Sequence, residues 1–185
     1  MEKITTRDVL KAIGVGGLII GTAAMGPSLP FIIVQAVKVW KDVNKKDLGR
    51  IIKRLEKQEM IRIKELEDKI SIEITEKGKR RILEYDFENL EIRAKKRDGK
   101  WRLIIFDIPE DKKINRDLFR KKLIQLGLVW FQDSVFASAF PCKNEIDFLC
   151  HYLEISDFVT VVVLDKIERG EQLIFKKYTG DNELL

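Results

Sequence analysis

The sequence is poor in the residues that most metal sites and nucleophilic enzymes use. It contains one histidine, His151, and two cysteines, Cys142 and Cys150, among 185 residues. Two Cys and one His fall short of the four ligands of a closed zinc site. On an expected helix the two cysteines would lie about 12 Å apart along the axis, too far for a disulfide. We therefore expect reduced thiols, a cytoplasmic protein and no bound cofactor.

Motifs of other catalytic classes are also missing. There is no Gly-x-Ser-x-Gly nucleophile motif and no phosphate-binding glycine-rich loop. The GVGG at residues 14–17 lies inside an expected helix and follows no strand. With 45% hydrophobic and 35% charged residues the chain has enough core material to fold. Its net charge of +5 modestly favours polyanionic partners, nucleic acid above all.

Residues 12–37 contain no charged side chain. Their length could span a bilayer, but scattered glycines together with Pro27 and Pro30 divide the segment into shorter pieces. We expect two core helices here, Arg7–Met25 and Phe31–Trp40. Membrane contact by residues 12–37 is the alternative.

Residues 45–58 have the pattern of an amphipathic helix. Leu48, Ile52 and Leu55 recur on one face, and lysines and arginines form a stripe on the other. Apolar and polar residues then alternate in residues 60–64 and again in residues 70–74, which predicts a hairpin. Thr75 is placed to cap a further helix that runs to about Tyr85.

This order of helices and ribbon is that of a winged helix-turn-helix, whose third helix enters the major groove of DNA. Phosphate contacts would supply most of the affinity, and Arg50 or Arg54 could read a guanine edge. A solvated surface helix is the alternative. The candidate DNA-binding residues of this module are Lys45, Lys46, Arg50, Lys53, Arg54, Lys57 and Lys69.

A basic linker, residues 91–100, joins the two halves and ends in an expected turn at Asp98-Gly99. The run Trp101–Phe106 that follows suits a strand buried on both faces, and Asp107 comes directly after it. Pro109 then blocks a helix.

The next helix is expected to start at Asp111 or Asn115 and to end near Leu126. Its predicted core positions are Ile114, Leu118, Leu123 and Leu126, and its predicted outward cations are Lys113, Arg116 and Arg120.

Two strands or one bent strand in residues 128–140, a helix over 143–152 and a strand over 158–164 complete the pattern, and residues 172–176 could add an edge strand. Strand, helix, strand, strand, helix, strand is the βαββαβ order of a ferredoxin-like domain. The chain is thus predicted to be an α+β protein, with an N-terminal winged helix-turn-helix followed by a ferredoxin-like domain.

The strings DGKWRLIIFDIPE (98–110), NRDLFRKKL (115–123), LGL (126–128), QDSVF (132–136) and FPC (140–142) are recognisable together. They resemble the central domain of PaaX-type transcriptional repressors. They are also similar to the ferredoxin-like CRISPR-associated Cas-two protein. We expect the chain to have four parts: helices and winged helix-turn-helix in residues 1–90, the basic linker, a domain in residues 101–178 that resembles the Cas-two protein, and a tail in residues 179–185.

Three functional hypotheses follow. The first is a repressor that binds double-stranded DNA as a homodimer paired through the ferredoxin-like domain. The second is a Mg²⁺-dependent nuclease, in which Asp107 and its symmetry mate hold the metal across a dimer, as the resemblance to the CRISPR protein implies. The alternative role for Asp107 is to accept backbone N–H bonds at the strand end. The third is a scaffold in which Lys113, Arg116 and Arg120 hold DNA for a partner enzyme of a CRISPR-type integration complex.

Overall fold

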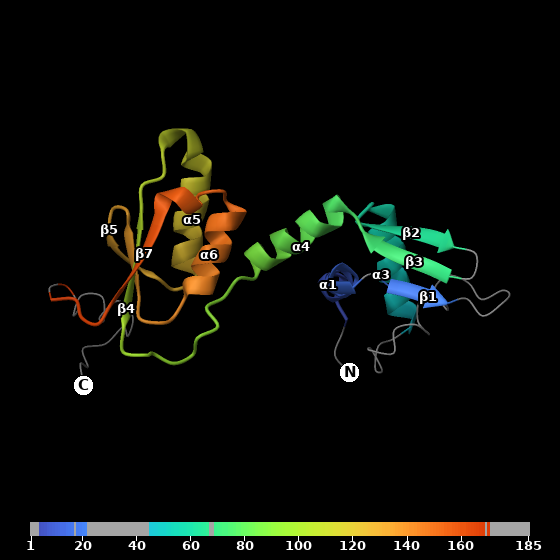
Figure 1. Cartoon of the computed structure of the whole chain (residues 1–185), viewed down its shortest axis with the longest axis horizontal. Coiled ribbons are helices and arrows are strands. Elements are labelled where there is room, and N and C mark those ends of the chain that lie inside the picture. The colour runs from blue at the N-terminus through green and yellow to red at the C-terminus, as the bar shows by residue number, and fades with distance from the viewer. Residues whose placement is uncertain (1–3, 17, 22–44, 67–68, 169, 171–185) are drawn as a thin grey trace. The chain divides into compact units, whose positions relative to one another are not determined.

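The structure is a computed structural model that describes residues 4–16, 18–21, 45–66, 69–168 and 170. The chain divides into two compact units, Met1–Glu88 and Asn89–Leu185, and each has its own antiparallel sheet (Figure 1). No helix in the described ranges is long and apolar enough to cross a membrane. The expected helix Phe31–Trp40, and with it most of the uncharged segment 12–37, lies outside these ranges.

The N-terminal unit contains a three-stranded sheet in the order β1-β3-β2. Its described elements are α1 (Thr6–Gly16), β1 (Leu18–Gly21), α3 (Lys45–Lys57), β2 (Ile61–Leu66), β3 (Lys69–Ile74) and α4 (Glu76–Glu88). The predicted basic helix and hairpin are confirmed, with Ile61 opposite Ile74 across β2 and β3.

The expected first helix, Arg7–Met25, is wrong beyond Gly16. There α1 ends, and β1 pairs with β3 so that Leu18 lies opposite Ile72. Consecutive glycines at 16 and 17 weaken a helix, and the β-branched Ile19 and Ile20 favour a strand. The sheet therefore has a third strand that the sequence pattern had not indicated.

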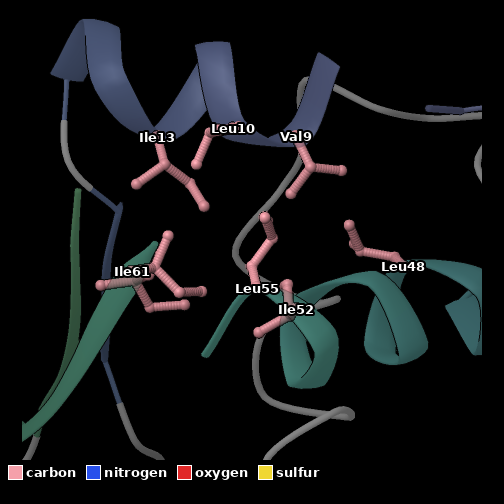
Figure 2. Packing of buried hydrophobic residues seen from close by; sticks show 8 residues of the cluster. Val9, Leu10, Ile13, Leu48, Ile52, Leu55 and Ile61 are labelled. Carbon is pink, nitrogen blue, oxygen red and sulfur yellow. The ribbon is translucent and has the colours of Figure 1, made fainter. Parts of the chain in front are cut away.

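The core of this unit lies between α1, α3 and the sheet. Figure 2 shows Val9, Leu10 and Ile13 of α1 facing Ile52 and Leu55 of α3, and all five are buried. Each set recurs at three- and four-residue spacing, so one face of each helix is apolar. This packing fixes which face of α3 points inward and leaves the opposite face in solvent.

The start of α4 is held against the beginning of the hairpin. The Thr75 hydroxyl accepts the N–H of Gly78 at 3.1 Å and donates to the Glu59 carbonyl at 2.7 Å. Thr75 therefore caps α4, as predicted. A Cβ on Gly78 would lie only 2.1 Å from the Met60 carbonyl oxygen, so glycine permits the close approach of helix and strand.

The C-terminal unit contains a four-stranded antiparallel sheet in the order β5-β6-β4-β7. Its described elements are β4 (Trp101–Phe106), α5 (Lys113–Gln125), β5 (Val129–Gln132), β6 (Val135–Ser138), α6 (Lys143–Tyr152) and β7 (Val159–Leu164), with 3-10 turns at Glu110–Lys112 and Ser156–Phe158. This is the predicted βαββαβ order, and residues 128–140 form two strands rather than one. The expected edge strand 172–176 lies outside the described residues.

The prediction that β4 is buried on both faces is only half right. Ile104 and Phe106 point toward the helices and are buried, as is Trp101 on the other face. Ile105, also on the other face, is 39% exposed. Both helices lie on the same side of the sheet, so one face near the end of β4 stays open to solvent (Figure 1).

The predicted orientation of α5 is also partly wrong. Leu123 and Leu126 are buried as expected, but Ile114 is 76% exposed and Leu118 is 40% exposed. Phe119 takes their place in the core, where its ring meets that of Phe106 edge to face at 5.4 Å. The helix is therefore rotated about its axis relative to the expected face.

Candidate nucleic-acid interface

The outer face of α3 carries the candidate DNA-binding residues. Leu48, Ile52 and Leu55 are buried against α1. The residues on the opposite side are exposed, and five of them are cations: Lys46, Arg50, Lys53, Arg54 and Lys57. Because the inward face is fixed by packing, these charges are held on a rigid helix.

These cations differ in their internal partners. Arg50 lies 3.5 Å from the Asp47 carboxylate, in a pair that is open to solvent. Within the described residues, the side chains of Lys53, Arg54 and Lys57 make no hydrogen bond or ion pair. Cations without a carboxylate partner gain most from a phosphate, since no existing ion pair has to break.

Two further predicted residues are placed by their backbone. Lys45 begins α3, and Lys69 begins β3 opposite Leu66 and Gly21. The side chains of both lie outside the described part of the chain.

The hairpin adds cations that the sequence analysis had not selected. Arg62 and Lys64 of β2 are exposed. Ile61, the residue before Arg62, is buried. Lys64 pairs with Glu73 across the ribbon at 2.8 Å, and Arg62 makes no such pair with a described residue. The alternation of apolar and polar residues in β2 was the signal that could have identified both.

The predicted cations of α5 are engaged within their own unit. Lys113 and Arg116 both lie against Glu110, at 3.6 Å and 2.8 Å. Arg116 also donates to the Ile108 carbonyl at 3.2 Å, and its side chain is only 25% exposed. The hydrogen bond from Arg116 lowers the pKa of the Glu110 carboxyl. Lys113 points outward as expected, whereas Arg116 does not.

Arg120 is likewise turned toward the protein. Its guanidinium donates to the Asp133 carbonyl in the β5–β6 turn and lies 5.8 Å from the centre of the Phe106 ring. Arg116 and Arg120 thus hold the loops at one end of the sheet. Their predicted role in binding DNA stays a prediction.

Asp107 is exposed at the end of β4. Its backbone N–H donates to the Phe158 carbonyl at 3.0 Å, but in the described ranges its carboxylate accepts no hydrogen bond. The expectation that this carboxylate accepts backbone N–H groups is therefore wrong. Among the same residues no three His, Cys, Asp or Glu side chains gather to hold a metal. A magnesium site shared between two chains stays a prediction.

The cysteines offer no reactive site. Cys142 and Cys150 are free and buried, and burial raises the pKa of both thiols, that of Cys150 to about 11. At neutral pH both stay protonated and are poor nucleophiles and metal ligands.

The strand order β5-β6-β4-β7, with both helices on one face, defines a ferredoxin-like domain. Residues 94–173 match the family model of the PaaX protein central Cas2-like domain. These residues therefore form a domain similar to the central, Cas2-like domain of PaaX proteins. A comparison with curated proteins gives no match.

Proposed function

We propose that the chain is a DNA-binding transcriptional regulator of the PaaX type, a cytoplasmic repressor that binds duplex DNA as a homodimer. The observation that carries this proposal is the outer face of α3. One side of the helix is fixed against α1, and the other presents Lys53, Arg54 and Lys57 without internal partners among the described residues. Such a face suits contact with the phosphates that border a groove.

The surrounding elements support a winged helix-turn-helix. A basic helix is followed by the β2–β3 ribbon, and β1 joins the same sheet. The 13 residues of α3 extend about 20 Å, which suits a helix lying in the major groove. In this arrangement Arg50 or Arg54 contacts bases, and Arg62 on the ribbon contacts the backbone.

The homodimer would form through the ferredoxin-like domain. Ile105 is exposed and Leu103 half-buried on the sheet face that no helix of the described residues covers, which leaves apolar surface for a second copy. Two-fold pairing would present two α3 helices to half-sites about 34 Å apart.

Selection of bound duplexes from a random pool in EDTA tests the proposal. We expect a motif with two related half-sites and an affinity that falls steeply with salt. Binding without any sequence preference would contradict a repressor.

A Mg²⁺-dependent nuclease is the second candidate, because the Asp107 carboxylate is exposed and has no partner in the described ranges. The same selection is repeated with Mg²⁺ and analysed on a denaturing gel. Cleavage that is lost in Asp107→Ala would favour the nuclease over the repressor. A motif without cleavage would favour the repressor.

A further inference from the structure

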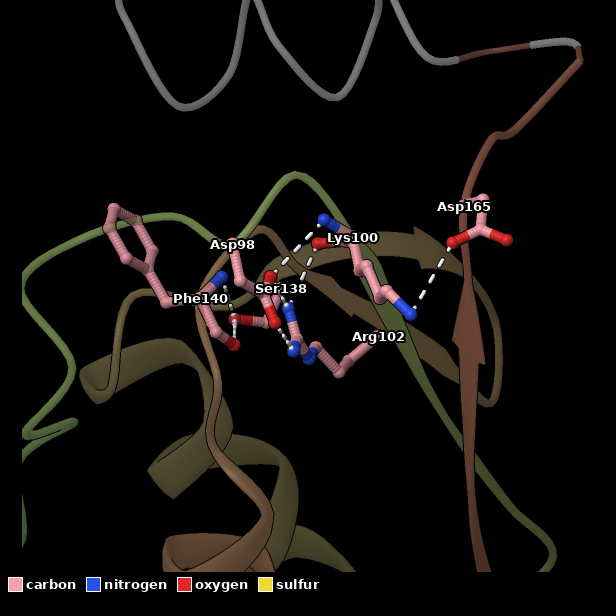
Figure 3. Close-up of polar contacts among 6 residues, drawn as sticks. All are labelled: Asp98, Lys100, Arg102, Ser138, Phe140 and Asp165. Atoms are coloured by element: carbon pink, nitrogen blue, oxygen red, sulfur yellow. Dashed lines mark hydrogen bonds and ion pairs between the residues drawn. The ribbon is translucent and has the colours of Figure 1, made fainter.

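The basic linker, residues 91–100, is held to the C-terminal unit at two points. Near its start, the Arg93 N–H donates to Glu145 of α6 at 3.3 Å. At its end, Asp98 binds Arg102 of β4 through both carboxylate oxygens (Figure 3). The backbone between these points has neither helix nor strand, yet its path is fixed at both ends.

The contact at Asp98 also pairs the carboxylate that directly follows Arg97. The Arg102 side chain is buried, and its guanidinium holds the pKa of the Asp98 carboxyl well below the usual range. Asp98 accepts the Lys100 N–H at 3.2 Å as well, and Gly99 takes the positive φ of 79° that this turn needs. The predicted Asp98-Gly99 turn is therefore confirmed, and its carboxylate is committed to Arg102.

Three of the cations between the two points face solvent, whereas the Arg97 guanidinium lies 5.2 Å from the centre of the Trp101 ring. Arg93, Lys95 and Lys96 are exposed and make no hydrogen bond or ion pair through their side chains with any described residue. Ile92 and Ala94, which alternate with Arg93 and Lys95, are half-buried. The apolar side chains thus turn toward the protein and the charged ones away from it.

We propose that residues 93–97 are a second DNA-binding element, which contacts the sugar–phosphate backbone of duplex DNA without reading its sequence. The proposal rests on the DNA binding proposed above and adds a site outside the winged helix. Fully extended, these five residues span roughly 16 Å, and phosphates follow one another at about 3.4 Å of rise along each strand. The segment is therefore long enough for its cations to reach successive phosphates.

The pattern of burial favours DNA over an anionic membrane. A membrane-binding segment combines cations with apolar side chains that enter the lipid. Here the apolar side chains of Ile92 and Ala94 are half-buried, and the side chains exposed to solvent in residues 93–97 are those of the cations. Because the segment is held at both ends, less conformational entropy is lost when it binds.

The test compares two double variants that remove the same charge. Lys95→Gln with Lys96→Gln alters the linker, whereas Lys121→Gln with Lys166→Gln removes two exposed cations elsewhere in the same unit, also without partners among described residues. The affinity of the full chain for duplex DNA is measured over a salt series, with the selected duplex and with a scrambled one. Far-UV circular dichroism and melting temperature verify the fold, and both should be unchanged.

We expect the linker variant to lower the slope of log affinity against log salt by about 1.8, from about 0.9 per phosphate contact. The loss should be equal on both duplexes, because the contacts carry no sequence information. The control variant should keep the wild-type slope. A linker variant with the wild-type slope would overturn the inference while leaving the repressor proposal intact.

Other outcomes separate the two proposals. If wild-type protein binds both duplexes equally and the linker variant lowers the slope, the linker site stands and the repressor proposal fails. If wild-type protein binds neither duplex, both fail. Binding to phosphatidylserine vesicles that is lost in the linker variant, with DNA binding unchanged, would assign the segment to a membrane and overturn the inference.

Discussion

Arg102 and Asp98 form a two-point ion pair between a buried guanidinium on β4 and an exposed carboxylate at the end of the linker. The same guanidinium donates to the Lys100 carbonyl at 3.0 Å. A buried arginine depends on such partners because its charge has lost the surrounding water. This contact therefore both stabilises the domain and fixes the end of the linker against β4.

Asp98→Asn should lower the melting temperature of the protein, and the effect should depend on pH. The pKa of Asp98 is depressed in the folded chain, so its contribution is complete above the pKa of about 3.9 expected for the unfolded chain. It is lost as pH falls through the lower folded value. The melting temperature of the wild type should thus be higher than that of the variant by a constant difference near neutral pH. This difference should become smaller below about pH 4. Thermal melts across this range provide the measurement, and a difference independent of pH would contradict the assignment.

Phe119→Ala should destabilise the chain by about 3–5 kcal/mol, the usual cost of removing a buried aromatic ring. Phe119 is fully buried and contacts Phe106. The matched control on the same helix is Ile114→Ala, which should change stability by less than about 0.5 kcal/mol because Ile114 is largely exposed. Urea denaturation of both variants measures the difference. A larger loss of stability in Ile114→Ala than in Phe119→Ala would mean that α5 has the orientation first predicted from sequence.

That comparison also explains what sequence patterns could and could not predict. The face of α3 was predictable because only one apolar stripe, Leu48–Ile52–Leu55, satisfies its spacing. In α5 two stripes compete, one with Ile114 and Leu118 and one with Phe119 and Leu123. The choice between them depends on Phe106 and thus on a contact distant in sequence.

The residues of the candidate site were also predictable only in part. The exposed cations of α3 were predictable from helical spacing alone. The inward turn of Arg116 was not, because its partners Glu110 and the Ile108 carbonyl belong to the loop that follows β4. A strand as short as Leu18–Gly21 was also missed, since its residues continue an apolar run and only pairing with β3 distinguishes it from a helix.

Gly78→Ala should destabilise the N-terminal unit although alanine favours helices by about 1 kcal/mol. The added methyl group would lie 2.1 Å from the Met60 carbonyl oxygen, a backbone atom, so α4 or β2 has to move. We expect a net loss of about 1–3 kcal/mol, the usual range for overpacking. The control is Gly14→Ala in α1, whose methyl group would meet the Ile82 side chain at 3.1 Å and can be accommodated by a small shift of that side chain. Denaturant midpoints of the two variants give the measurement, and a stabilised Gly78→Ala would contradict the packing described.

The proposed role of α3 is tested by Lys53→Gln combined with Lys57→Gln. Both side chains are exposed and lack internal partners in the described part of the chain, so the fold should be unaffected while DNA binding weakens. Two lost phosphate contacts should lower the slope of log affinity against log salt by about 1.8. The matched control removes the same charge from α4, by Lys77→Gln with Lys79→Gln, where each lysine is paired with a carboxylate. Fluorescence anisotropy with a labelled duplex measures both variants. If the α4 variant weakens binding as much as the α3 variant, net charge rather than the face of α3 governs the interaction, and the major-groove arrangement proposed for α3 is wrong.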